Sequence, residues 1–285
     1  MVGESGCGKS VTSLSLLQLL GVGGAVTGGE IWFDGVNLLS LPPSHIRKWR
    51  GGKIAMIFQE PMTAFNPVLT VGEQIMEQMR VHLPRISARE ERDHTVELLK
   101  TVGIPSPETR LDQYPHELSG GMRQRAMIAM ALSCNPDLLI ADEPTTALDV
   151  TIQAQILDLL LELQEKFGMA IQFITHDMGV ISEVSDRIVV MYAGIIVEKA
   201  DATTIFNRPL HPYTVGLLES IPKIDQTMHR LQTIEGAVPH LTQLPKGCPF
   251  QNRCPRVIEQ CRREEVVLEE VGIDHYVACF NPVAR

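Results

Sequence analysis

The chain has 285 residues, of which 44% are apolar and 21% are charged, proportions that suit a globular protein with a sizeable core. Its formal net charge is −9, which argues against sequence-independent binding to nucleic acid, because such binding needs an excess of lysine and arginine. The sequence contains no run of 18 apolar residues and no basic leader followed by an apolar segment and a cleavage site. It therefore predicts neither a membrane span nor secretion.

Helix and strand signals alternate along the chain as far as residue 200. A glycine-rich loop occupies Gly3–Ser10, an apolar helix is expected at Val11–Leu20, and Gly29–Gly35 has the composition of a strand. The remaining expected elements, in chain order, are a strand at Ile54–Phe58, helices at Thr70–Arg80 and Ser87–Val102, a strand at Leu138–Ala141, a helix at Ile152–Phe167, and strands at Ala170–Thr175, Arg187–Tyr192 and Ile195–Glu198. This alternation favours a largely parallel sheet covered by helices, an α/β fold. From residue 201 the periodicity gives way to proline-rich segments and a cysteine-bearing tail.

The octapeptide Gly3–Ser10 (GESGCGKS) matches the phosphate-loop pattern G-x-x-x-x-G-K-[ST] in full. Its glycines let the backbone curl so that successive N–H groups point at phosphate oxygens, and the following helix adds its positive N-terminal end. Lys9 is expected to reach the β- and γ-phosphates of ATP, and the Ser10 hydroxyl to coordinate Mg²⁺. The alternative is a glycine-rich turn ahead of a helix. The residues expected to bind the nucleotide are Gly3, Ser5, Gly6, Cys7, Gly8, Lys9, Ser10 and Val11.

Two carboxylates follow the apolar strand predicted at Leu138–Ala141. Asp142 is placed to hold the Mg²⁺ shell, as the acidic residue at the end of such a strand does in other phosphate-loop enzymes. Glu143 is expected to polarise the attacking water, a contribution worth about 10²–10⁴ in rate. Without the phosphate loop, the pair would indicate only a capped strand end with solvated acids. Together the two motifs predict an enzyme that binds and hydrolyses ATP.

The segment Leu118–Arg125 (LSGGMRQR) is similar to the signature L-S-G-G-Q-x-Q-R of ABC-transporter ATPases, with Met122 where glutamine is commonest. Ser119, Gly120 and Gly121 at a helix start offer a second ring of N–H donors and a dipole end. An N-capped helix with a flexible start is the alternative for Ser-Gly-Gly alone. The resemblance implies that the signature of one subunit closes over ATP held by another, so that two ATPase subunits sandwich the nucleotide.

Three further positions resemble this family in the expected order. Gln59 is similar to the Q-loop glutamine, which reaches Mg²⁺ and the water and links the site to the helical region. Thr146–Asp149 is similar to the D-loop, which crosses the dimer interface, and His176 to the H-loop histidine, which contacts the γ-phosphate. The resemblance implies catalytic roles for Glu143, His176 and Gln59, and a Mg²⁺ site made by Ser10, Gln59 and Asp142.

Within the family, Glu60–Pro67 (EPMTAFNP) and His211–Thr214 (HPYT) resemble the ATP-binding subunits of dipeptide and oligopeptide importers. In that branch the C-terminal extension carries C-P-F-x-x-R-C followed by two more cysteines. This chain has CPFQNRC at Cys248–Cys254, then Cys261 and Cys279. The resemblance implies import of di- or oligopeptides, with substrate choice made elsewhere in the transporter. Nickel and glutathione are alternative cargoes of close relatives.

The four clustered cysteines, Cys248, Cys254, Cys261 and Cys279, are separated by five, six and seventeen residues. This spacing lacks the C-x2-C pairs usual in zinc sites and favours a wrapped [4Fe–4S] cluster, with zinc and reduced thiols as the alternatives. Such a cluster would hold together a tail that is too poor in apolar periodicity to fold alone.

We therefore expect an ATPase core at residues 1–58 and 136–200, a helical subdomain bearing the signature at 59–135, and a C-terminal extension at 201–285. The implied partners are a second ABC ATPase subunit (identical or a sister chain), two membrane permease subunits and, indirectly, an extracytoplasmic substrate-binding protein. The implied location is peripheral, on the cytoplasmic face of the membrane. Nucleic acid is not an expected partner; a soluble ABC ATPase acting on nucleic acid is the alternative function, and the negative charge weighs against it.

Only Met1 and Val2 precede the phosphate loop. Family members carry a longer leading segment, which supplies the strand entering the loop and an aromatic residue that stacks on adenine. The sequence thus resembles an N-terminally truncated member, through a start assigned too far downstream, a fragment or a natural truncation. We expect a loop without its strand to bind ATP weakly, and no adenine-stacking residue is assigned.

Overall fold

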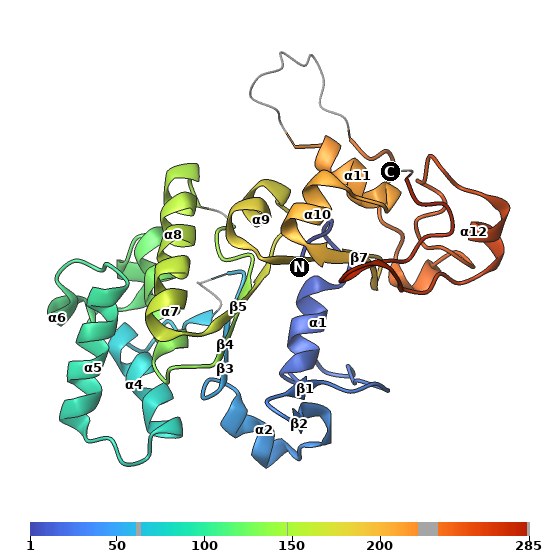
Figure 1. The fold of residues 1–285 in the computed structure, drawn as a ribbon. Coiled ribbons are helices and arrows are strands. Elements are labelled where there is room, and N and C mark those ends of the chain that lie inside the picture. The colour runs from blue at the N-terminus through green and yellow to red at the C-terminus, as the bar shows by residue number, and fades with distance from the viewer. Residues whose placement is uncertain (61–63, 147, 222–232, 284–285) are drawn as a thin grey trace. The chain divides into compact units, whose positions relative to one another are not determined.

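The computed structural model describes residues 1–60, 64–146, 148–221 and 233–283. The chain forms two compact units, of which unit 1 comprises Met1–Thr12 and Phe173–Arg285, and unit 2 comprises Ser13–Gln172. Figure 1 shows their helices and strands along the chain. The expected division into core, helical subdomain and extension remains a prediction.

A three-stranded sheet has the order β3 (Ile54–Ile57), β4 (Leu138–Asp142), β5 (Ala170–Ile174), and β3, β4 and the first three residues of β5 belong to unit 2. β3 and β4 are parallel, with Ile54 opposite Leu138. All of β4 beyond its first residue is buried, which explains why its sequence is a continuous apolar run and not an alternating one. The strands predicted here, and the parallel pairing of β3 with β4, are confirmed.

Three helices of unit 2, α4 (Val71–His82), α5 (Ala88–Thr101) and α7 (Gly120–Leu132), pack against one another. The first two begin with capping boxes at Thr70 and Ser87. Each hydroxyl accepts a hydrogen bond from the N–H of the glutamate three residues on, and that glutamate accepts one from the capping residue's N–H. The two helices are therefore where the sequence predicts them, with the first predicted residue serving as the cap.

The helix α8 (Val150–Phe167) confirms the predicted helical spacing of apolar residues. It ends at Gly168, whose φ of 66° lies in the left-handed region that glycine adopts most readily. The buried apolar side chains of this helix are Ile156, Leu157, Leu159, Leu160 and Leu163.

Two predictions near the start of the chain need correction. The helix α1 (Lys9–Leu16) begins two residues before the predicted Val11 and ends four residues before the predicted Leu20. It stops there because Gln18 has a left-handed φ of 51°. The strand expected at Gly29–Gly35 is reduced to β1 (Trp32–Phe33), because Asp34 and Gly35, with φ of 48° and 73°, turn the chain directly into the antiparallel β2 (Val36–Asn37). The other elements of unit 2 are α2 (Pro43–Trp49), α6 (Pro107–Arg110) and two 3-10 turns at Leu38–Ser40 and Pro115–Glu117.

Unit 1 contains a four-stranded antiparallel sheet in the order β6-β7-β9-β8. The expectation of a largely parallel sheet is wrong for this part of the chain. The physical reason is the two-residue turn Ala193–Gly194, whose φ angles of 45° and 87° close β6 and β7 into a hairpin. The strands are β6 (Arg187–Tyr192), β7 (Ile195–Asp201), β8 (Glu269–Gly272) and β9 (His275–Val277).

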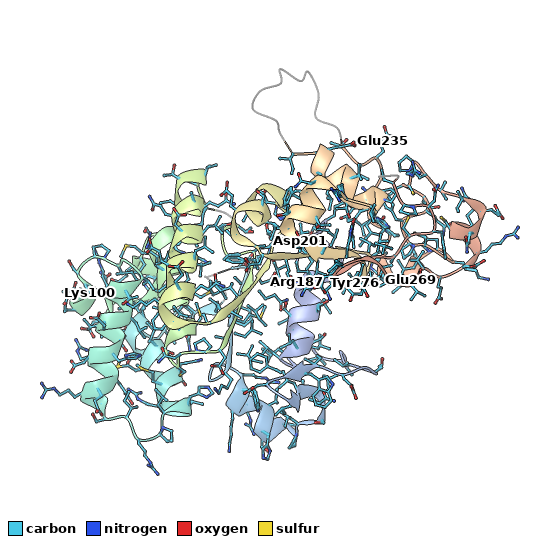
Figure 2. The ribbon with its side chains drawn as sticks, in the orientation of Figure 1. Lys100, Arg187, Asp201, Glu235, Glu269 and Tyr276 are labelled. Atoms are coloured by element: carbon cyan, nitrogen blue, oxygen red, sulfur yellow. The ribbon has the colours of Figure 1, made fainter. Side chains whose placement is uncertain are left out.

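Facing residues along this sheet lie on strands that are near and on strands that are distant in the sequence. Arg187 lies opposite Asp201 in the hairpin, and Lys199 lies opposite Tyr276 of β9, with its ammonium 4.9 Å from the ring centroid. Figure 2 labels Arg187, Asp201, Tyr276 and Glu269 along the sheet. The far end of the chain therefore adds two strands to a hairpin formed about 70 residues earlier, which no local pattern announces.

The chain after residue 201 is more regular than its sequence pattern indicates. Short helices form at α10 (Ala202–Asn207), α11 (Pro212–Glu219) and α12 (Glu259–Arg263), in addition to α9 (Met178–Val184) earlier in the unit and a 3-10 turn at Leu241–Gln243. The caps explain why α10 and α11 form: the carboxylate of Asp201 accepts from the N–H of Thr204, and Nδ1 of His211 accepts from the N–H of Tyr213. These helices are too short for periodicity to reveal them.

Candidate functional site

In unit 2, Gln59 and Glu143 are in direct contact. Nε2 of Gln59 donates a hydrogen bond of 2.8 Å to Oε2 of Glu143, although 84 positions separate the two residues. Gln59 lies two residues after β3 and Glu143 directly follows β4. Because these strands are parallel neighbours, their carboxyl ends meet at one edge of the sheet. The structure thus brings together two residues that separate motifs predicted.

The Glu143 carboxylate is held by a second donor. Oγ1 of Thr146 donates 2.9 Å to the same Oε2 atom, and the Thr146 N–H donates 3.1 Å to the Glu143 carbonyl. Glu143 itself has a φ of 46°, a left-handed conformation that costs a non-glycine residue on the order of 1–3 kcal/mol. The sharp turn after β4 and these hydrogen bonds therefore hold the Glu143 carboxylate in one orientation. Of the predicted D-loop, Ala147 lies outside the described residues, as do Pro61, Met62 and Thr63 of the predicted importer segment.

Asp142 ends β4 and is only 4% exposed. Carboxylate oxygens are the ligands that Mg²⁺ prefers, and a strand end holds such a ligand in a fixed direction. A buried carboxylate needs polar or cationic partners, because burying an unpaired charge is costly. Its chemistry and position therefore fit a Mg²⁺ ligand beside Glu143.

The predicted signature forms the start of α7. Ser119 is the N-cap, and its Oγ accepts a hydrogen bond of 3.3 Å from the N–H of Met122. Ser119 and Gly120 are exposed. The first turn of a 13-residue helix, with its unpaired N–H groups and positive dipole end, therefore lies at the surface of unit 2.

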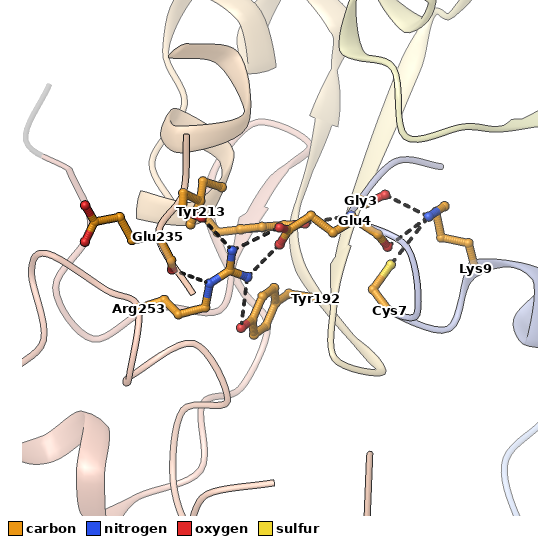
Figure 3. Close-up of polar contacts among 9 residues, drawn as sticks. Gly3, Glu4, Cys7, Lys9, Tyr192, Tyr213, Glu235 and Arg253 are labelled. Atoms are coloured by element: carbon orange, nitrogen blue, oxygen red, sulfur yellow. Dashed lines mark hydrogen bonds and ion pairs between the residues drawn. The ribbon is translucent and has the colours of Figure 1, made fainter. Parts of the chain in front are cut away.

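In unit 1, the loop Gly3–Ser10 wraps around the ammonium of Lys9. That side chain is only 5% exposed, and Nζ donates to the carbonyl oxygens of Gly3 at 2.7 Å and Glu4 at 3.1 Å, as Figure 3 shows. The sulfur of Cys7 lies 3.8 Å from the same nitrogen. Burial raises the pKa of the Cys7 thiol, and the nearby lysine only partly offsets this. The loop therefore centres on a positive charge, with a neutral thiol beside it.

The backbone just before the loop is hydrogen-bonded on both sides. Val2 forms parallel bridges to Thr175 and to Val190; its N–H donates 2.9 Å to the Val189 carbonyl. Val2 bridges its two neighbours as a single residue, and the prediction that the longer strand entering the loop is missing remains a prediction.

Two contacts with the β6–β7 hairpin also shape the loop. A Cβ atom on Gly3 would collide with the carbonyl oxygen of Met191, so only glycine fits there. On the far side of the loop, the N–H of Gly194 donates 2.9 Å to the Cys7 carbonyl. The hairpin turn therefore holds the loop from two directions.

The predicted site residues fall into two sets. Gly3–Ser10 and His176 belong to unit 1, where His176 is exposed between β5 and α9. Gln59, Asp142, Glu143 and the signature belong to unit 2. Their convergence on one nucleotide remains a prediction.

The four clustered cysteines occupy one region of unit 1. The N–H of Cys248 donates 2.8 Å to the carbonyl of Cys261, and no disulfide joins any of the four. The pKa of Cys248 and of Cys279 is raised to about 11, mainly by burial; the charges of Cys254 and Cys261 contribute in both cases, and that of Cys248 also contributes for Cys279. The thiols are thus close enough to interact electrostatically, although in the described part of the chain no three His, Cys, Asp or Glu side chains have the arrangement of a metal site.

Two family models match the chain. Residues 1–146 match the model described as "ABC transporter", and residues 197–261 match that described as "Oligopeptide/dipeptide transporter, C-terminal region". The chain belongs to the ABC transporter family. It is an ATPase of that family, and the α/β fold of an ABC-type phosphate-loop ATPase predicted from the motifs is confirmed.

Relatives of the ABC transporter family match this chain over nearly its whole length. The probable peptide ABC transporter ATP-binding protein y4tR of Sinorhizobium fredii is 55% identical over 99% of this chain and 84% of its own length. The dipeptide transport ATP-binding protein DppD of Haemophilus influenzae is 50% identical over 99% of this chain and 85% of its own length. The oligopeptide transport ATP-binding protein AppD of Bacillus subtilis is 51% identical over 98% and 85%.

Solved structures of ABC cassettes resemble the fold. The dimeric post-hydrolysis state of the cassette MJ0796 bound to ADP and Pi has a TM-score of 0.62 and 30% identity, covering 70% of this chain and 83% of that one. CbiO1 from Clostridium perfringens, part of the transporter complex cbiONQ, has a TM-score of 0.62 and 28% identity, covering 73% and 78%. Among the helices of the described ABC chain, none is long and apolar enough to cross a membrane.

One arrangement near the ATP loop was not predicted from the sequence. Arg253 of the CPFQNRC sequence forms an ion pair with Glu4 of the phosphate loop. Glu4 occupies a variable position of the loop pattern, so the motif gives it no role. The one available signal is that Arg253 lies within the cysteine-rich segment, Cys248–Cys254, and this position does not identify Glu4 as its partner.

Proposed function

We propose that this ABC ATPase energises the import of di- or oligopeptides. The observation that carries the proposal is the pair of matches at its two ends: an ABC transporter region at 1–146 and an oligopeptide/dipeptide transporter C-terminal region at 197–261. Relatives named for peptide, dipeptide and oligopeptide transport, 50–55% identical over 98–99% of the chain, support the same cargo class.

In the proposed mechanism, the loop Gly3–Ser10 holds the phosphates of ATP. Its backbone N–H groups and the Lys9 ammonium would bind phosphate oxygens, and the Ser10 hydroxyl would join Asp142 and Gln59 around Mg²⁺. The buried position of Lys9 supports this role, because water screens its charge little. Mg²⁺ would neutralise charge that develops on the phosphates.

Glu143 is the proposed general base. Its Oε2 atom accepts hydrogen bonds from Gln59 and Thr146. These two bonds fix the orientation of the carboxylate and therefore the direction in which Oε1 points. A carboxylate fixed in this way can orient an attacking water and accept its proton. His176, exposed at the end of β5, would contact the γ-phosphate.

The signature Ser119–Gly121 is proposed to act on ATP bound by a second ABC ATPase subunit. Its helix N-terminus is exposed and suited to an anion. ATP would then bridge two subunits, and hydrolysis would release them, a switch biased by ligand. The proposed partners are this second subunit, two membrane permeases and, through them, a substrate-binding protein. The proposed location is the cytoplasmic face of the membrane.

The four cysteines are proposed to hold a [4Fe–4S] cluster. The support is their donor chemistry and their proximity, since each of the six pairs interacts electrostatically. Four thiolates are the usual ligand set of such a cluster. The cluster would hold the extension together, with Cys248, Cys254, Cys261 and Cys279 as its ligands.

Reconstituted transport tests the cargo. The chain, assembled with its permeases in vesicles, should hydrolyse ATP faster when the binding protein carries a di- or oligopeptide, and should accumulate labelled peptide. Nickel or glutathione accumulation without peptide uptake would replace the cargo, and ATPase stimulation by nucleic acid alone would overturn the transport function.

A further inference from the structure

Glu4 lies between two cations of unit 1. Its carbonyl oxygen accepts 3.1 Å from Nζ of Lys9, while its carboxylate accepts from both terminal nitrogens of Arg253, at 2.7 and 2.9 Å. Figure 3 shows this chain of contacts. A single residue of the phosphate loop thus joins the loop's lysine to the cysteine-rich segment, 249 positions away.

The guanidinium of Arg253 uses every donor that it has. In addition to the two bonds to Glu4, it donates to the hydroxyl of Tyr192 at 3.4 Å and to the carbonyls of Ile234 and Glu235 at 3.0 and 2.9 Å. Its side chain is 5% exposed. An exposed ion pair contributes little, but a bidentate pair with five satisfied N–H donors fixes both partners in direction. The pair is therefore built to position, not merely to attract.

The same contacts reach the backbone of the loop. The Tyr213 hydroxyl accepts 2.8 Å from the Glu4 N–H, so both the main chain and the side chain of this residue are held. Tyr213, Tyr192 and Phe250 form a buried aromatic cluster with ring centroids 4.8, 5.1 and 5.4 Å apart. Phe250 belongs to the cysteine-rich segment, as Arg253 does. The segment thus contacts the loop directly through the Arg253–Glu4 ion pair, and indirectly through the packing of Phe250 against Tyr213.

We propose that Arg253 is a positioning residue for the phosphate loop, which acts through Glu4 and makes ATP affinity depend on the folded state of the cysteine-rich segment. The inference rests on the proposed role of Gly3–Ser10 in binding phosphate. Phosphate donors must be held to a few tenths of an ångström, and the Glu4 peptide sits next to the Lys9 ammonium. Releasing the Glu4 carboxylate would let this part of the loop shift.

Binding and turnover measurements on the whole chain test the proposal. Arg253→Met should raise the Kd for a fluorescent ATP analogue, measured in the presence of Mg²⁺, and the KM for ATP, each roughly ten- to hundredfold. The kcat at saturating ATP should change little. The ATP affinity of Arg253→Lys should lie between those of the parent and Arg253→Met, because an ammonium restores the charge but not the bidentate geometry of the guanidinium. Glu4→Gln should lower ATP affinity about as much as Arg253→Met does. The double variant should bind ATP no more weakly than the more impaired of the two single variants, since both changes break the same contact. Arg262→Met, at an exposed arginine of α12, is the matched control and should leave affinity unchanged.

The outcomes separate this inference from the function on which it rests. Loss of ATP binding in Lys9→Ala, together with a Kd within about twofold of the parent in folded Arg253→Lys and Glu4→Gln, overturns the positioning role alone. Unchanged binding in Lys9→Ala overturns the proposed phosphate site instead. If the two single effects multiply in the double variant, Arg253 acts independently of Glu4 and the inference is wrong. Thermal unfolding and cysteine alkylation confirm that each variant is folded, and Arg253→Lys keeps the test decisive if Arg253→Met does not fold.

Discussion

Nε2 of Gln59 lies 2.8 Å from Oε2 of Glu143, and Oγ1 of Thr146 lies 2.9 Å from the same oxygen. The carboxylate proposed to activate water is therefore oriented by one residue from the end of β3 and one from its own turn. A proton acceptor held in this way should be sensitive both to its own replacement and to the loss of either donor.

Replacing Glu143 with glutamine should reduce kcat about 10²–10⁴-fold, because an amide cannot accept the proton of the attacking water. ATP affinity should be retained, since the phosphate loop is unchanged, and an ATP-bound dimer should accumulate on size-exclusion chromatography. Glu162→Gln, on the exposed face of α8, is the control. Turnover near the parent rate in Glu143→Gln would remove Glu143 from the mechanism.

Gln59→Ala should lower kcat roughly ten- to hundredfold, the usual range for losing a hydrogen bond to a charged group. Thr146 still donates to the Glu143 carboxylate in this variant, so the loss should be smaller than that of Glu143→Gln. Steady-state kinetics with Mg²⁺ and ATP measure both, with the exposed Gln155→Ala as the control. Equal losses in the two variants would contradict this ranking and would indicate that the proposed Mg²⁺ contact of Gln59, and not its hydrogen bond to Glu143, dominates its role.

Gly72 of α4 packs closely against the backbone of Leu111, which makes it a test of stability. A Cβ there would lie 2.7 Å from the carbonyl oxygen of Leu111 and 2.8 Å from its Cδ1, so Gly72→Ala should destabilise unit 2 by about 1–3 kcal/mol. Gly21→Ala, where a Cβ meets nothing within 4 Å, should not. Urea midpoints give the comparison, and an unchanged midpoint in Gly72→Ala would show that α4 can shift freely.

His211 should make stability depend on pH. Burial lowers its pKa to about 3, and Nδ1 must stay unprotonated to accept the Tyr213 N–H. In the unfolded chain the His211 imidazole takes up a proton near its ordinary pKa of about 6.5, whereas in the folded chain it does not. The free energy of unfolding therefore has its full value above pH ~6.5 and falls on acidification, by up to about 1.4 kcal/mol per pH unit. Nearby, the Glu198 carboxylate accepts a hydrogen bond from the backbone N–H of His211 and pairs with the His275 ring.

His211→Asn keeps a capping oxygen and removes this titration. Urea unfolding at several pH values between about 4 and 7 should therefore give a shallower slope for the variant than for the parent. The parent and the variant share every other titratable group, so the difference between their slopes isolates His211. Identical slopes would mean that His211 titrates normally in the folded chain.

Anaerobically purified protein should contain iron and absorb visible light if the cysteines hold a cluster. Cys254→Ser should lose iron, whereas Cys134→Ser, at a cysteine in unit 2 far along the chain, should keep it. Iron analysis and the absorption spectrum measure this, independently of ATPase activity. A colourless, iron-free sample with all four thiols open to alkylation would exclude the cluster.

The sequence by itself determined the local features of this ABC ATPase. Capping pairs such as Thr70 with Glu73 and the buried run of β4 depend on neighbours a few residues away, so spacing alone reveals them. The short elements after residue 201 escaped prediction, because α10, α11 and α12 have eight residues or fewer and carry no periodicity long enough to detect.

The tertiary structure decided which distant residues meet. Gln59 reaches Glu143 only because β3 and β4 lie side by side, and β9 pairs with β7 only after the chain has returned from the cysteine-rich segment. Arg253 meets Glu4 across 249 positions because Tyr213, which accepts a hydrogen bond from the Glu4 N–H, packs against Phe250 of the cysteine-rich segment. Such contacts depend on how elements pack and not on their spacing along the chain. The sequence therefore identified the ATPase, and only the fold joined its phosphate loop to the cysteine-rich tail.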